Sequence, residues 1–114
     1  MLDKPLLWLG SSRAEVRAFP KDARQETGFQ LRRVQQGLTA TDWRPVKAVG
    51  PGVMEIRVHS GGEFRLFYVA KFAEAVYVLH AFQKKSAKAP WSHIEVAKRR
   101  YSELQRMRKK GKGT

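Results

Sequence analysis

The chain has 114 residues, enough for one domain with one core, and 42% of them are hydrophobic, which excludes a disordered chain. Lys and Arg number 23 against 10 Asp and Glu, and the net charge of +13 favours nucleic acid, the ribosome or an acidic protein as partner. Solubility alone is the alternative explanation, although a net charge of about 2–8 would suffice for it. The absence of cysteine excludes a disulfide framework and thiol chemistry.

Residues 5–10 form a short apolar run that predicts an edge strand. Ser12 and Glu15 fit a capping box and predict the start of a helix, and Pro20 can begin a second helix. We therefore expect a helical hairpin over residues 12–36. The N-terminus lacks the basic start and cleavage site of a signal peptide, and no apolar run approaches the ~20 residues of a membrane span, so we expect a cytoplasmic protein without a membrane partner.

Residues 39–52 are rich in turn formers and predict a loop in which Trp43 plugs the edge of the core. Three β-branched and aromatic runs follow between residues 54 and 85, separated by two short polar breaks, and they predict an antiparallel meander. Strict alternation would place Val76, Val78, His80 and Phe82 on one face of its third strand.

Beyond Pro90, Ser92 is expected to cap a final helix. Its apolar stripe is Ile94, Ala97, Tyr101, Leu104 and Met107. We expect one domain over residues 1–105 and a basic, disordered tail over residues 106–114.

The chemistry available to the chain is basic and aromatic. The three histidines show no spacing typical of metal ligands, and no phosphate-binding glycine loop or nucleophile elbow is present, so we expect no metal and no small-molecule cofactor. Arg, Lys, His and aromatic residues around a small sheet suit metal-free RNA cleavage. In that reaction a base activates the ribose 2′-oxygen, cations hold the phosphorane and an acid protonates the leaving oxygen.

Four motifs occur in order along the chain: G-P-G-V-M-E-I-R-V at 50–58, E-F-R-L-F-Y-V at 63–69, V-Y-V-L-H-A-F-Q-K-K-S at 76–86, and A-P-W-S-H-I-E-V-A-K-R-R-Y at 89–101. Together they resemble the RelE/ParE superfamily of bacterial toxins, most closely the phage-derived branch of HigB-like toxins. The resemblance runs from about residue 5 to residue 104. It implies an α+β fold in which an N-terminal helical hairpin packs on an antiparallel sheet, with a C-terminal helix.

The resemblance also implies a function, namely a metal-free mRNA interferase that cuts translated message in the ribosomal A site and is blocked by a cognate antitoxin. A small helix-turn-helix protein is the expected antitoxin. The chain departs from some relatives because its C-terminal tyrosine, Tyr101, falls in the apolar stripe of the final helix rather than at a catalytic position.

Arg65 matches the mid-strand arginine of the family, and we expect it on the open concave face of the sheet as a phosphate-binding catalytic residue, with an ion pair to Glu55 or Glu63 as the alternative. The expected catalytic set is completed by Arg57, His80, Lys84 and Lys85. The alternative for Arg57 is an ion pair with a carboxylate, and the alternative for His80 is a buried, hydrogen-bonded histidine. The alternative for the two lysines is a solvated pair. The expected RNA-binding residues are Phe82, which would stack a base or pack in the core, and the cations Arg44, Lys47, Lys98 and Arg99.

Two other functions remain open from the sequence. A ParE-like protein of the same fold would bind DNA gyrase and cut no RNA, and a passive RNA-binding module would need only the positive charge.

Overall fold

The computed structural model describes residues 3–112 and is an α+β fold, as the sequence predicts. The elements follow one another as β1 (Leu6–Trp8), α1 (Ser12–Arg17), α2 (Lys21–Gln35), β2 (Trp43–Pro45), β3 (Val53–His59), β4 (Glu63–Val69), β5 (Val76–Lys84) and α3 (Trp91–Lys112). In this part of the chain no helix is long and apolar enough to cross a membrane.

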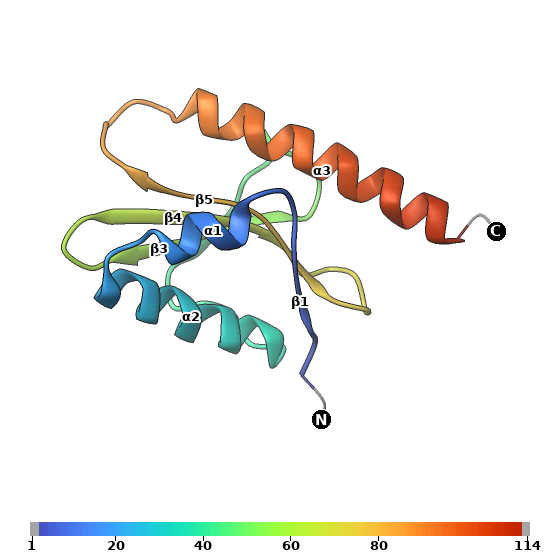
Figure 1. Cartoon of the computed structure of the whole chain (residues 1–114), viewed down its shortest axis with the longest axis horizontal. Coiled ribbons are helices and arrows are strands. Elements are labelled where there is room, and N and C mark those ends of the chain that lie inside the picture. Colours follow the sequence, from blue (N-terminus) through green and yellow to red (C-terminus); the bar gives the residue numbers. More distant parts are fainter. Residues whose placement is uncertain (1–2, 113–114) are drawn as a thin grey trace.

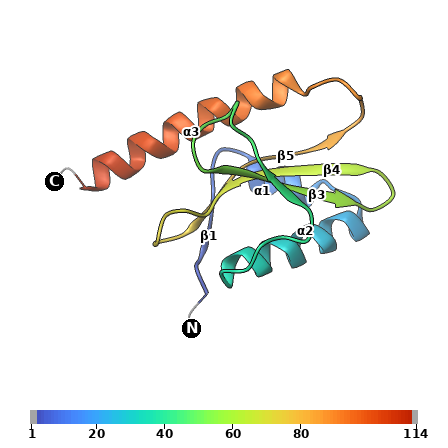
Figure 2. The ribbon, with the colours of Figure 1, turned by 180° about the vertical axis from the view of Figure 1, so that it is seen from behind.

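The strands form one sheet in the order β1-β5-β4-β3-β2. The predicted meander β3-β4-β5 is antiparallel throughout, but β1 joins its edge in parallel to β5, so the sheet is mixed rather than antiparallel as the resemblance implied. Helices α1 and α2 cover one face of the sheet and α3 crosses the other, as the two opposite views show (Figures 1 and 2). The sheet is therefore buried on both sides over much of its area.

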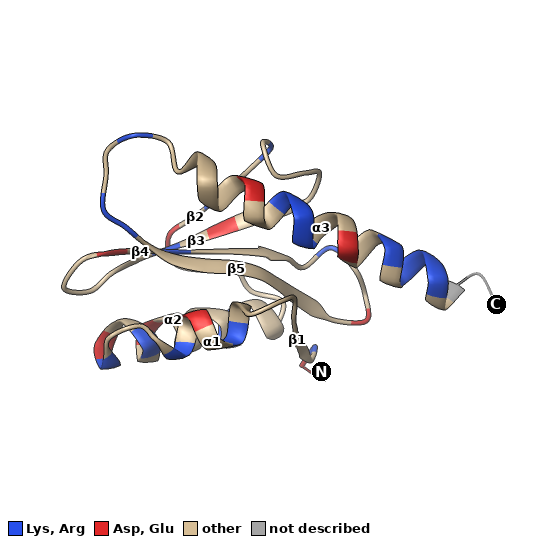
Figure 3. Cartoon of the chain, turned by 45° about the horizontal axis from the view of Figure 1, so that its top comes forward, with Lys and Arg blue, Asp and Glu red and all other residues tan. Residues whose placement is uncertain are grey.

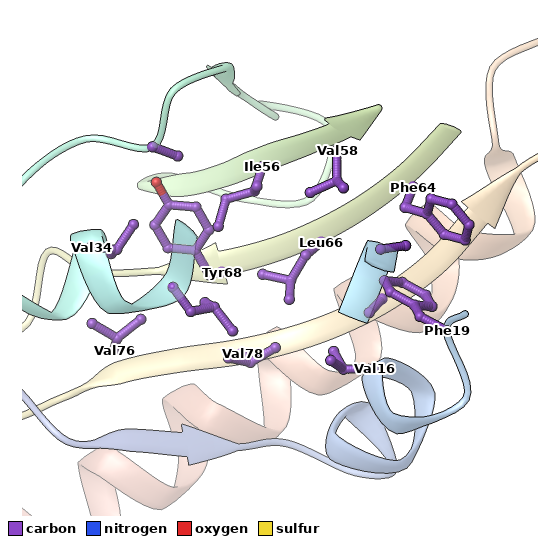
Figure 4. Packing of buried hydrophobic residues seen from close by; sticks show 14 residues of the cluster. Val16, Phe19, Val34, Ile56, Val58, Phe64, Leu66, Tyr68, Val76 and Val78 are labelled. Carbon is purple, nitrogen blue, oxygen red and sulfur yellow. The ribbon is translucent and has the colours of Figure 1, made fainter. Parts of the chain in front are cut away.

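The core between the sheet and α1–α2 is built from inward-facing strand residues and the apolar side of the two helices (Figure 4). Phe19 and Phe64 lie at one end of it, with ring centroids 4.8 Å apart. A second core lies under α3, where Leu104 and Ala97 are fully buried against Phe67 and Leu79. Removal of this apolar surface from water on both faces stabilises the three-layer arrangement.

A β-bulge interrupts the ladder between β4 and β5. Phe67 pairs with His80 whereas Tyr68 pairs with Val78, so Leu79 is the extra residue of β5. The prediction of strict alternation along this strand is therefore wrong beyond Leu79: Phe82 lies on the α3 face, opposite to Val76 and Val78.

Several predicted boundaries also differ from the structure. Helix α1 follows Ser11 rather than Ser12, whose hydroxyl instead donates to the Val78 carbonyl at 3.1 Å. Helix α3 begins at Trp91, so Ser92 lies inside it. It continues to Lys112, so the expected disordered tail from residue 106 is helical as far as the structure describes it, and residues 113–114 lie outside the described residues. The predicted loop over residues 39–52 contains the short strand β2, in which Trp43 is 42% exposed rather than a plug of the core.

Candidate functional site

A cleft of about 290 Å³ opens where β5 ends and α3 begins. It is lined by Phe82, Lys84, Lys85, Lys88, Pro90 and His93, among others. The structure thus places three of the predicted site residues in the cleft, and adds Lys88 and His93. The Lys84 ammonium donates to the Ser86 carbonyl at 2.6 Å, which fixes the turn that carries the neighbouring lysines. Three ammonium groups and one imidazole around a small cleft make a site for an anion that also gains or loses a proton.

His80 lies behind this cleft, at the position that the bulge creates. It is 5% exposed, and its Nδ1 lies 2.8 Å from Glu15 Oε1 while its Nε2 lies 2.8 Å from His93 Nδ1. A ligand in the cleft would therefore meet His93 before His80. The expectation that His80 is itself the acid or base is not supported by its depth, and its alternative, a buried hydrogen-bonded histidine, describes its position.

Glu15 connects α1 with both β5 and α3. Besides His80 it accepts hydrogen bonds from the Ala81 backbone N–H at 3.1 Å and from Arg100 Nη1 and Nη2, each at 3.0 Å. Burial alone would raise the pKa of Glu15, but the hydrogen bonds from His80, Arg100 and Ala81 outweigh it and hold the pKa far below its usual range. Glu15 is consequently ionised wherever the protein is folded near neutral pH.

His93 is half-buried, and its pKa is lowered first by burial and then by the neighbouring His80, with Glu15 acting in the opposite direction. Its ring stacks on Phe82 at a centroid distance of 3.9 Å and an interplanar angle of 8°. Phe82 is 5% exposed and also contacts Phe67 edge-to-face at 5.4 Å. The structure places Phe82 in the core, which was the alternative for this residue, and His93 covers one face of its ring, so stacking of a nucleobase on Phe82 stays a prediction.

The predicted arginines form a second cluster on the same face of the sheet. Arg57 and Arg65 pair across β3 and β4, and Arg65 in turn pairs with Phe82 across β5, so this cluster adjoins the cleft. The buried carboxylate of Glu55 lies 2.8 Å from Arg44, 3.8 Å from Arg57 and 4.0 Å from Arg65. One carboxylate therefore stands at the centre of three guanidinium groups.

Arg65 is buried rather than open to a concave face, which corrects the prediction. Its side chain is 4% exposed, and its guanidinium donates to Glu63 at 3.3 Å and to the Phe64 carbonyl at 3.1 Å. The Nε atoms of Arg57 and Arg65 are buried without a hydrogen-bond partner. The ion pairs that were the alternative for Arg65 are present, so a phosphate could reach its guanidinium only after those contacts open.

The remaining predicted cations lie outside both clusters. Lys47 is exposed in the loop between β2 and β3, and Lys98 is exposed on α3, 3.7 Å from Glu95. Arg99 borders a shallow polar hollow along α3. Lys and Arg residues are frequent along α3 and on the loop before it (Figure 3).

Sequence reasoning missed Glu15, His93 and Arg100. Glu15 was assigned only a capping role, and His93 was considered only as a metal ligand. The i, i+7 spacing of His93 and Arg100 on one helix was a usable signal, since residues so spaced lie on the same face. In residues 3–112 no group of three or more His, Asp or Glu side chains is arranged to hold a metal ion.

A family model described as "Phage derived protein Gp49-like (DUF891)" matches residues 14–102. The match covers the end of α1, all of α2, the meander and about the first half of α3, and therefore the cleft, the histidines and the arginine cluster. The family is associated with RelE-like and toxin-like proteins. No curated protein matches the chain.

Proposed function

Because the chain belongs to the phage-derived Gp49-like family, we propose that it is the toxin of a toxin–antitoxin pair and that it cuts messenger RNA on the ribosome. The finer assignment, to the HigB-like branch of the RelE superfamily, is part of this proposal. It rests on the four sequence motifs and on the chemistry of the cleft.

The observation that carries the proposal is the grouping of Lys84, Lys85 and Lys88 around His93. Cleavage by the ribose 2′-oxygen needs a group that accepts a proton and cations that hold the charge growing on the phosphate. The cleft supplies both within a volume suited to a small part of the RNA rather than to a duplex. It is an enzyme site in this proposal, and no cofactor takes part.

The charge of +13 supports polyanionic partners. The cleft and the exposed basic residues of α3, including Lys98 and Arg99, would bind the message and ribosomal RNA. An antitoxin that is acidic where it docks would neutralise the toxin, and a helix-turn-helix protein is the expected partner. A protein acting on translating ribosomes works in the cytoplasm.

Primer extension on a message in a translating extract tests the proposal directly. The wild-type protein should produce discrete ends within the translated frame, and none when ribosomes are omitted. Toxin treated with EDTA and returned to normal buffer should cut equally well. Arrested cells with intact message and double-strand DNA breaks would instead identify a gyrase inhibitor, and RNA binding without new ends a passive module.

A double substitution, Lys84→Gln with Lys85→Gln, should lower cleavage by about 10²-fold or more, since loss of even one donor to a developing charge typically costs that much. The matched control is Lys109→Gln with Lys110→Gln, which removes the same charge from exposed positions at the other end of α3. Equal losses from the two double variants would show that the cleft lysines contribute only general charge.

A further inference from the structure

Three ionisable side chains from three different elements stand in a line that ends at the cleft. Glu15 comes from α1, His80 from β5 and His93 from α3, and each consecutive pair of polar atoms is 2.8 Å apart. Both distances are within hydrogen-bonding range. The line leads from a half-buried carboxylate, through a buried imidazole, to an imidazole that borders the cleft.

The hydrogens along this line follow from the chemistry of the atoms. A contact of 2.8 Å between His80 Nδ1 and a carboxylate oxygen requires the hydrogen to be on Nδ1, because Glu15 is ionised. The facing nitrogens of His80 and His93 share one further hydrogen. Nε2 of His93 is then the only nitrogen of the line that is not engaged within it.

A purely structural role would not need the two histidines. Glu15 already joins α1 to α3 through Arg100. At the other end of α3, Glu74 accepts from Tyr77 at 2.7 Å and from Arg108 at 2.7 Å, and so ties the same helix to the sheet with a carboxylate and an arginine and without any histidine. The histidine pair at the cleft end is therefore in excess of what attachment of the helix requires.

We propose that His93 is the proton-transferring residue of the cleft, and that Glu15 and His80 are positioning residues which orient its ring and set its affinity for a proton. This inference rests on the proposed ribonuclease function and names its general base. It follows the logic of a carboxylate and an imidazole that support the working base of a triad, extended by one histidine.

In the reaction, Nε2 of His93 takes the proton of a ribose 2′-hydroxyl. The 2′-oxygen forms a bond to the adjacent phosphorus, the bond from phosphorus to the 5′-oxygen breaks, and that oxygen takes a proton from a cleft lysine. The products are a 2′,3′-cyclic phosphate and a 5′-hydroxyl. The proton held by His93 returns to the lysine through water, so the enzyme is regenerated without an oxidant, reductant or metal.

The charges facing His93 come from every element packed against it. Four cations oppose a second proton on the imidazole, namely Lys84 and Lys85 at the end of β5, Lys88 in the following loop and Arg100 on α3. The carboxylate of Glu15 on α1, acting through His80, favours the second proton. Removing the charge of Glu15 should therefore lower the pKa of His93. The pH at which cleavage begins should move down with it.

The experiment measures single-turnover cleavage of a ribosome-bound message across pH 5.5–9 for the wild type, His93→Ala, Glu15→Gln and the control Glu74→Gln. His93→Ala should lose about 10²-fold or more at neutral pH, the usual contribution of a general base, and added imidazole should restore part of the rate. Glu15→Gln should reach a lower maximal rate, and its rise with pH should begin at lower pH. Glu74→Gln should keep the wild-type profile, because its carboxylate joins α3 to the sheet without a histidine.

Titration of the His93 ring protons by NMR in the same proteins gives a readout that does not depend on activity, and Glu15→Gln should lower the His93 pKa. A His93→Ala protein that cuts at the wild-type rate would overturn this inference and leave the proposed function standing. This inference would also be overturned, with the proposed function left standing, by a Glu15→Gln protein that only has a lower thermal midpoint, as Glu74→Gln does, and keeps the wild-type pH profile and His93 titration. A wild-type protein that produces no ends in RNA would overturn the proposed function, and this inference with it.

Discussion

Replacement of Arg65 with alanine should destabilise the whole domain rather than only disable a surface site. The guanidinium is 4% exposed and donates to Glu63 and to the Phe64 carbonyl, so its removal leaves acceptors without a partner in the sheet. Breaking a buried pair from one side costs about 3–5 kcal/mol. We expect the lower end, about 3 kcal/mol, because Glu63 is half exposed to water and Glu55 keeps its contact with Arg44.

For a domain of this size, 1 kcal/mol corresponds to roughly 4 °C in the unfolding midpoint, so Arg65→Ala should lower it by about 12 °C. Circular dichroism on heating measures the shift, and Arg65→Met, which keeps the aliphatic stem, separates the lost charge from the lost packing.

The control is Arg57→Ala on the paired strand. The Arg57 side chain is 35% exposed and lies 3.8 Å from Glu55, so we expect its removal to cost less than about 1 kcal/mol. A folded Arg65→Ala protein with a midpoint within about 3 °C of the wild type would refute the reasoning. If the shift is found, a loss of toxicity in Arg65→Ala has to be measured per folded molecule.

Two further predictions concern stability. Glu15 has a lowered pKa in the folded state, so its contribution to the free energy of unfolding is fully present above its unfolded pKa of about 4.3 and is lost as the pH falls below that value. The unfolding midpoint of the wild type should therefore move toward that of Glu15→Gln as the pH is lowered from neutral to pH 3. Heating both proteins at each pH measures the difference. A constant gap between the two midpoints would contradict this. Gly50→Ala should lower the midpoint by about 4–12 °C, since the added Cβ would clash with the buried Tyr101 ring and overpacking typically costs about 1–3 kcal/mol. The variant Gly28→Ala, where the Cβ meets open space, is the control and should be neutral or stabilising.

The helices and the strands of the meander were predictable because each has a strong local pattern, whereas β2, three residues within a segment rich in turn formers, has none. The period-2 runs of β3 and β4 and the apolar stripe of α3 are read directly from neighbouring residues. The bulge in β5 was not predictable from one sequence, since the extra residue, Leu79, is an ordinary strand residue and only its partner strand determines that it is surplus.

The residues of the candidate site that lie in one segment, His80, Phe82, Lys84 and Lys85, were predicted, whereas those on the two helices were not. Lys84 and Lys85 were found at the end of a strand, but Glu15 and His93 come from opposite ends of the chain and meet only because α1 and α3 both pack near the same edge of β5. Arg65 was identified correctly as unusual, yet its sequence position gave no measure of depth. Its burial depends on Glu63 and Glu55, one in its own strand and the other on the neighbouring strand.

The bulge in β5 also governs how relatives of this chain should be compared. Because Leu79 is a surplus residue, odd and even positions exchange faces of the sheet between the two halves of β5. In a sequence alignment, a gap placed away from Leu79 would therefore assign residues that face α2 to the α3 face, and the reverse. A relative that lacks the surplus residue would have a regular ladder with the same residues on each face, because removal of Leu79 restores simple alternation between Val78 and His80. In such comparisons the face of each residue should be counted backward from the paired lysines as far as the bulge, and forward from Val76 on its other side.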